Sequence, residues 1–262
     1  MKIGLYGDSF TEAHRPAQHF AWYNQLATML GGVVYNFDKE ESGISYGMGA
    51  SSTYWSYKNF LRRHEQHDLN IFIASDPMKF PEPLPIHGPN RRPKPISGMA
   101  SLEWYEQDPD VTPEGQEMLH HVKSWTLISH EPFMMLAQEL MLQDMERRSK
   151  GRLLILPASM TFGPAFTPER WEQTDLKFAM WDVVRVMMGS ISSLNDCGVQ
   201  GKFPALPTAS EERPDMIAAH MTEEANTWVA NSLYNYILYR IPTALPEHIP
   251  HRFHYTKYLN RA

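Results

Sequence analysis

A serine and a histidine at distant points of the chain have the surroundings of a nucleophile and of its base. Ser9 follows a short apolar run at residues 3–6, and Gly7 allows the sharp turn that exposes a hydroxyl at a strand end. His220 precedes an amphipathic segment, and an imidazole accepts and returns a proton near neutral pH. Asp215 is the nearest acid upstream of it. These residue types predict nucleophilic acyl transfer, in which the backbone N–H of Ser9 is one oxyanion donor.

A plain turn is the competing interpretation of the first segment. The carboxylate of Asp8 can accept hydrogen bonds from nearby backbone N–H groups, as aspartates in turns commonly do. A histidine before a helix is likewise often a capping or surface residue. Ser9 and His220 gain weight together, because they occur in the order and context that one mechanism requires.

Metal and nucleotide sites have no matching pattern in the sequence. The chain holds 12 histidines, but none forms a His-Glu-x-x-His helix or an array with cysteine. Gly47-Met48-Gly49 lacks the third glycine of a dinucleotide-binding turn, and no Gly-Lys-Ser or Gly-Lys-Thr occurs. We therefore expect no metal and no cofactor.

The composition is that of a globular protein without a nucleic-acid or membrane partner. The 262 residues are 42% hydrophobic and carry a formal net charge of -6, without a long run of Lys or Arg. No stretch approaches the roughly 20 apolar residues that span a bilayer. The single cysteine, Cys197, cannot form an intramolecular disulfide, and the chain opens on a core strand instead of a secretory signal. We expect a cytoplasmic protein that acts on a small molecule.

Strand and helix patterns alternate along the chain, which predicts parallel pairing with helical crossovers. Apolar runs predict strands at residues 1–6, 33–37, 69–75 and 152–159. Three- and four-residue spacing predicts helices at residues 20–30, 55–61, 117–148 with an interruption at Pro132, 176–187 and 222–237. The expected fold is an α/β protein, a three-layer α/β/α sandwich with a parallel central sheet.

We expect one domain over residues 1–262, with one insertion and one extension. A proline-dense stretch at about 77–113 breaks the alternation and follows a strand end on the predicted active-site edge. We interpret it as a lid or substrate-binding insertion; a solvated loop without a role is the alternative. A C-terminal extension at about 242–262 either packs on the domain or reaches a neighbouring subunit, and the oligomeric state stays open.

Three sequence blocks, in this order, resemble those of the SGNH (GDSL-like) hydrolase family. Gly7-Asp8-Ser9 after a strand is similar to the nucleophile block, residues 43–52 resemble the second block, and His220 before a helix resembles the last. The resemblance covers nearly the full chain and implies a flavodoxin-like sandwich. It also implies that a glycine of the second block supplies an oxyanion N–H, which we place on Gly49, with Gly47 as the competing alignment.

Two positions depart from the family pattern. Ile73-Ala74-Ser75-Asp76 replaces Gly-x-Asn-Asp, so the asparagine donor is missing and Ser75 would donate through its hydroxyl. The family acid usually stands three residues before the histidine, where this chain has Ile217, whereas Asp215 lies five residues upstream. His220 would then be oriented by Asp215, be oriented by a backbone carbonyl, or act with Ser9 in a dyad.

The resemblance implies a serine esterase that cleaves a small acyl group, such as acetyl, from a carbohydrate or a similar metabolite. A catalytically weakened binding or assembly protein is one alternative, and an acyltransferase is another. The expected site residues are Ser9, His220 and Asp215 for catalysis, Ser9, Gly49 and Ser75 for the oxyanion hole, and Asp8, Gly47 and Asp76 for substrate binding.

Overall fold

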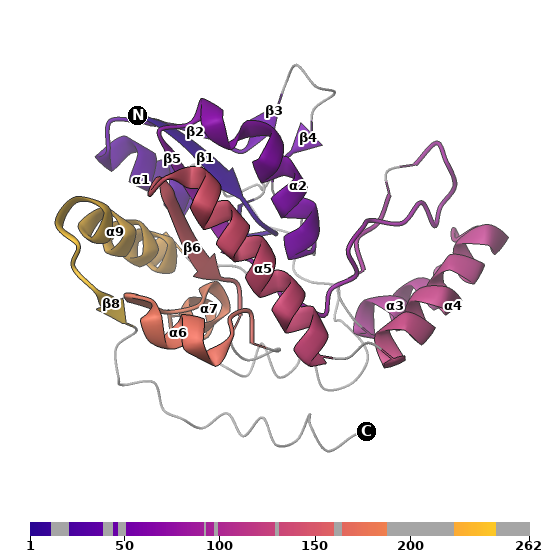
Figure 1. Cartoon of the computed structure of the whole chain (residues 1–262). Helices are drawn as coiled ribbons and strands as arrows, with labels where there is room; N and C mark the ends of the chain where they lie inside the picture. The colour runs from indigo at the N-terminus through magenta and orange to yellow at the C-terminus, as the bar shows by residue number, and fades with distance from the viewer. Residues whose placement is uncertain are drawn as a thin grey trace.

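The computed structural model describes most of the chain, and Figure 1 shows its elements. The described residues are 1–11, 21–38, 44–46, 51–91, 93–96, 99–128, 131–159, 164–187 and 223–244. The strands in this part are β1 (Lys2–Tyr6), β2 (Val33–Tyr35), β3 (Phe37–Asp38), β4 (Ile44–Ser45), β5 (Leu69–Ala74), β6 (Leu153–Pro157), β7 (Leu176–Lys177) and β8 (Thr243–Ala244). The helices are α1 (Trp22–Met29), α2 (Thr53–Arg63), the short 3-10 helix η2 (His64–Gln66), α3 (Met99–Glu106), α4 (Pro113–Ile128), α5 (Glu131–Ser149), α6 (Pro168–Gln173), α7 (Met180–Met187) and α9 (Glu223–Tyr239).

A four-stranded parallel sheet with the order β2-β1-β5-β6 forms the centre of the fold. β1 lies between β2, where Ile3 is opposite Val34, and β5, where Leu5 is opposite Ile71. β6 pairs with the free side of β5. Helices lie in the sequence between the successive strands of this sheet, so the expected parallel α/β pairing is confirmed.

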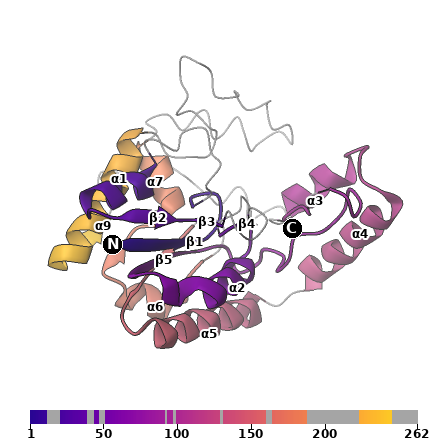
Figure 2. The same ribbon diagram turned by 90° about the horizontal axis from the view of Figure 1, so that it is seen from above.

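Alternate residues of the strands face two different sets of helices. Ile3 and Leu5 belong to a core that also contains buried residues of α1, α7 and α9. Tyr6 and Phe72 face the other way and pack with residues of α2 and α5. Figure 2 shows α1, α7 and α9 on one side of the strands and α2 and α5 on the other. Because both faces are covered, the strands are mostly apolar, as parallel strands usually are.

Local signals account for several helix ends. The hydroxyl of Ser52 accepts the N–H of Trp55 at 3.1 Å and caps α2. Gly31 follows α1 with a φ of +61°, a left-handed conformation that commonly ends helices. Pro132 lies in the first turn of α5, where a missing N–H costs little. The predicted helix at 117–148 is therefore two helices, α4 and α5.

Two segments have a different secondary structure from the one expected from the sequence, beyond shifts of a few residues at other ends. β2 ends at Tyr35, and β3 pairs with β4 in a separate antiparallel ribbon. The helix predicted from Leu176 begins only at Met180, because Leu176 lies in β7, which pairs in parallel with β8. Leu176 is buried in the larger core, so its apolar character was a sign of burial and not of helix.

The proline-rich insertion contains regular structure and a small core of its own. α3 lies within residues 77–113 and packs against α4, and both views show the pair to one side of the sheet (Figures 1 and 2). Gly115 of α4 lies so close to this insertion that a Cβ there would collide with the carbonyl oxygen of Ile86. The buried residues of this core are Ile86, Ile96, Leu102, Leu119 and Val122.

Candidate active site

The chain turns sharply after β1, and Gly7 makes this turn possible. Its φ is +151°, which residues with a side chain rarely adopt. A Cβ at this position would lie 2.7 Å from Cβ of Ile73 and 3.1 Å from the carbonyl oxygen of Ile73. The end of β1 therefore approaches β5 as closely as only a glycine allows.

Asp8 is the buried centre of the turn, with 1% of its surface exposed. Its carboxylate accepts the N–H of Phe10 at 3.2 Å, the hydroxyl of Ser75 at 3.1 Å and the ammonium of Lys79 at 3.3 Å. Its carbonyl oxygen accepts the N–H of Thr11 at 3.0 Å and the hydroxyl of the same residue at 2.8 Å. Asp8 therefore supports the turn from inside, and its burial favours this role over contact with a substrate.

Ser9 is the part of the turn that is available to a ligand. It is partly exposed, whereas Asp8 and Phe10 on either side are buried. Within the described part of the chain, neither its hydroxyl nor its backbone N–H forms a hydrogen bond. A hydroxyl in this state can attack an electrophile once a base takes its proton, and an N–H beside it can stabilise the oxyanion that forms.

The start of α2 is bonded to the ends of two strands. The hydroxyls of Ser51 and Ser56 both donate to the carbonyl oxygen of Gly7, at 3.2 and 3.0 Å. The hydroxyl of Thr53 donates to the carbonyl oxygen of Ser75 at 3.1 Å. All three side chains support the site without having been expected there. The run Ser51-Ser52-Thr53 at the start of α2 was a signal for Ser51 and Thr53, whereas Ser56 follows one turn later within the helix.

Ser75 and Asp76 follow β5 at the same edge as Ser9. Ser75 is fully buried, and its hydroxyl proton is used in the bond to Asp8. It would have to leave that bond before it could donate to an oxyanion. Asp76 accepts the N–H of Met78 at 2.8 Å. Burial raises the pKa of Asp76, while the Met78 N–H and Lys79 oppose the rise.

Lys79 is a cation at this edge that carries no motif in the sequence. A turn in which the N–H of Lys79 donates to the carbonyl oxygen of Asp76 at 3.2 Å returns the side chain toward Asp8. Only 13% of its side chain is exposed. Asp8 lies 71 positions earlier in the sequence, so no local pattern could have indicated the pair.

The turn after Ser9 is connected to the first turn of α9 through one tryptophan. The indole Nε1 of Trp22 donates to the carbonyl oxygen of Phe10 at 3.1 Å. The backbone N–H of Trp22 donates to the side-chain oxygen of Asn226 at 2.8 Å. Trp22 is 1% exposed, so both bonds are shielded from water. The described residues thus bring the amino-terminal turn and the late helix together.

Several expected site residues lie outside the described part of the chain. They are Gly47, Gly49, Asp215 and His220. Their roles stay predictions. The described residues bring Ser9, Asp8, Ser75 and Asp76 together at the carboxyl end of β1 and β5, where open α/β sheets bind their ligands.

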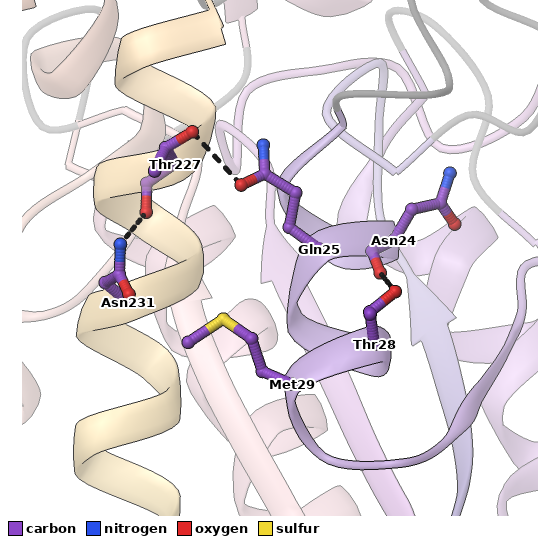
Figure 3. A pocket seen from close by; sticks show the side chains of 6 residues that line it. All are labelled: Asn24, Gln25, Thr28, Met29, Thr227 and Asn231. Atoms are coloured by element: carbon purple, nitrogen blue, oxygen red, sulfur yellow. Dashed lines mark hydrogen bonds between the residues drawn. The ribbon is translucent and has the colours of Figure 1, made fainter.

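A surface pocket of about 460 Å³ lies between α1 and α9, away from this edge (Figure 3). The hydroxyl of Thr227 donates across it to the side-chain oxygen of Gln25 at 3.0 Å. α1 ends near Gly31, which contacts Met1 at the amino end of β1, opposite to Ser9. The pocket offers neither an acid nor a histidine for catalysis. Its lining residues are Asn24, Gln25, Thr28, Met29, Thr227 and Asn231.

The described residues offer neither a metal site nor a helix that could span a membrane. No group of three or more His, Cys, Asp or Glu side chains there could hold a metal ion. None of the helices described is long and apolar enough to cross a bilayer. Comparison of the chain with protein-family models, with curated proteins and with solved structures finds no match. The chemistry of this edge therefore has to follow from its residues.

Proposed function

We propose that the protein is a serine esterase of the SGNH type, with Ser9 as nucleophile and His220 as base. The proposal includes a three-layer, flavodoxin-like sandwich around the parallel sheet. Its substrate is a small-molecule or carbohydrate ester with a small acyl group such as acetyl, and the site of action is the cytoplasm. The alternation of strands and helices and the placement of Ser9 at a carboxyl strand end support it.

Trp22 provides the observation that carries this proposal. It joins Phe10, the residue after Ser9, to Asn226 in the first turn of α9. His220 precedes Asn226 by six residues, and a chain of that length spans at most about 20 Å. The connection therefore allows the imidazole to approach the hydroxyl, which is the condition that the mechanism needs.

The proposed reaction proceeds through an acyl-enzyme. His220 takes the proton of the Ser9 hydroxyl while Oγ of Ser9 bonds to the ester carbonyl carbon. The N–H groups of Ser9 and Gly49 then hold the oxyanion. The alcohol leaves with the proton from His220, and water then cleaves the new ester by the same steps. Asp215 orients the imidazole in the triad form of the proposal.

One observation favours the alternative of a weakened enzyme that binds a ligand. The hydroxyl of Ser75, which replaces an oxyanion donor of the family, is held by Asp8. Loss of one such donor lowers the rate by roughly a hundredfold or more. Transfer of the acyl group to an acceptor other than water would use the same residues.

A fluorophosphonate probe tests the nucleophile directly, because it phosphonylates activated serines. We expect labelling at Ser9, located by peptide mass spectrometry, and none in Ser9→Ala. Ser124→Ala is the matched control, since Ser124 is an exposed serine on α4, and it should label as the wild type does. A wild-type protein that resists the probe between about pH 6 and pH 9, where imidazole bases operate, would favour the binding protein.

The base is tested with two further variants. His220→Asn should abolish labelling, because no group then takes the proton of Ser9. Asp215→Asn should slow it strongly if the triad form holds and should have little effect if a dyad or a backbone carbonyl orients His220. Full labelling of His220→Asn would refute the assignment of the base.

A further inference from the structure

We propose that Lys79 is a positioning residue that couples the position of the proline-rich insertion to the conformation of the Ser9 turn through Asp8. The coupling itself follows from contacts within the described residues. Its consequence for catalysis rests on the proposed function of Ser9. Lys79 contacts neither the reacting atoms nor a substrate in this role, and it acts through the carboxylate that supports the turn.

The insertion is held together by its own contacts, so it can move as one unit. Phe80, the residue after Lys79, donates its N–H to the carbonyl oxygen of Ile96 at 3.1 Å. Its ring packs edge-on against Trp125 of α4, with centroids 5.3 Å apart. Leu84 and Lys94 pair through two backbone hydrogen bonds of 2.8 and 2.7 Å. Any movement of this unit is therefore transmitted to Lys79 at its root.

Asp8 depends on Lys79 for the only cation bonded to it in the described part of the chain. The carboxylate side chain is 2% exposed and the lysine side chain is 13% exposed. The other two groups on the carboxylate, the Phe10 N–H and the Ser75 hydroxyl, are neutral donors. A buried carboxylate that loses its cation is unfavourable, so we expect the turn to loosen or rearrange when Lys79 is withdrawn.

A second attachment of the insertion does not touch the turn. The hydroxyl of Ser52 donates to the carbonyl oxygen of Pro81 at 2.7 Å, and Lys58 pairs with Glu82. Both contacts fasten the root of the insertion to α2. Since the side chains of Lys58 and Glu82 are 36% and 44% exposed, removal of this pair should lower the stability only slightly. Lys58→Met is therefore a matched control for Lys79→Met.

The coupling has a direct readout in the hydrogen exchange of the turn. The amides of Phe10 and Thr11 are both bonded to Asp8, to its carboxylate and its carbonyl oxygen. In full-length Lys79→Met, exchange of the peptide spanning residues 3–11 should be faster than in the wild type by about tenfold or more. Lys79→Arg should restore most of the protection, and Lys58→Met should match the wild type.

Labelling and turnover report the consequence for Ser9. With an activated ester, Lys79→Met should lower kcat while leaving KM nearly unchanged, and Lys79→Arg should recover it, because only the placement of the nucleophile is altered. Fluorophosphonate labelling should slow in parallel. Labelling of Lys79→Met at the wild-type rate, with unchanged exchange, overturns the positioning role while the proposed function stands.

Failure of the proposed function leaves the coupling testable. If neither the wild type nor any variant is labelled at Ser9, the proposed function fails, and the exchange data still decide the coupling.

If Lys79→Met does not fold, the double variant Asp8→Asn/Lys79→Met is measured, because it removes both charges together. Recovery of folding and of protection at residues 3–11 supports the coupling, and continued failure overturns it.

Discussion

Replacement of Gly7 by alanine tests the geometry of the turn on which Ser9 lies. The backbone φ of +151° is a region that is essentially restricted to glycine, and occupying it costs a residue with a Cβ about 1–3 kcal/mol. The new methyl group would also lie 2.7 Å from Cβ of Ile73, an atom at the root of a buried side chain that cannot rotate away. Overpacking of this kind costs about 1–3 kcal/mol more.

The two contributions together amount to about 2–6 kcal/mol of the free energy of unfolding. Domains are typically stable by only about 5–15 kcal/mol, so Gly7→Ala should be severely destabilised. Gly31→Ala is the matched control. Gly31 has a φ of +61° and no atom within 4 Å of an added Cβ, so it should lose only the left-handed cost of about 1–2 kcal/mol.

Urea unfolding followed by tryptophan fluorescence measures both variants. In a protein of this size each kcal/mol also lowers Tm by about 2–4 °C, which gives a second readout. Equal losses of unfolding free energy in Gly7→Ala and Gly31→Ala would refute the reasoning, because of these two positions only Gly7 has atoms of Ile73 close to an added Cβ. A stable Gly7→Ala variant would mean that β1 and β5 do not approach as closely as described.

Three other substitutions test separate contacts. Trp22→Phe removes the indole donor to Phe10 and should cost about 1–3 kcal/mol in urea unfolding; an unchanged midpoint would show that this link adds no stability. Burial raises the pKa of Asp76. Its contribution to the free energy of unfolding is therefore favourable below 3.8, its pKa in the unfolded chain, and is lost as the pH rises through its pKa in the folded protein. Asp76→Asn should therefore raise Tm at neutral pH, and the gain should disappear below about pH 4. Burial lowers the pKa of His67, so its contribution is complete above the unfolded value of 6.5 and is lost as pH falls through the folded pKa. The urea midpoint of the wild type should therefore decrease as the pH is lowered from about 7 to about 5. His67→Gln keeps a partner for the Tyr6 hydroxyl and should make the midpoint less dependent on pH.

The parallel sheet could be predicted from local composition. Residues such as Ile3, Leu5, Ile71 and Ile73 are consecutive or alternating apolar side chains in short runs, and all four are fully buried. Strands covered on both faces read as apolar runs, and the helices between them have a three- and four-residue period. The sequence pattern was therefore sufficient to locate the four strands of the central sheet in the chain and to place Ser9 at the carboxyl end of the first one.

Contacts between distant residues were beyond a local pattern. The core of the insertion joins Ile86, Leu102 and Leu119, which belong to a loop and two helices, and prolines around them resemble those of an irregular loop. The pair of Asp8 and Lys79 is likewise formed only by the fold. The roles of the residues that lie outside the described part stay predictions.

The bond between Trp22 and Asn226 spans 204 positions, which has a consequence for how the chain is made. A ribosome completes the strand and turn that carry the alcohol long before it reaches α9. Until then, the apolar side of α1 with Trp22 and Leu26 lacks the helix that covers it. An unfinished or truncated product would therefore expose an apolar surface that chaperones bind, and the proposed reactivity toward esters, which needs His220, would arise only in the last stage of synthesis.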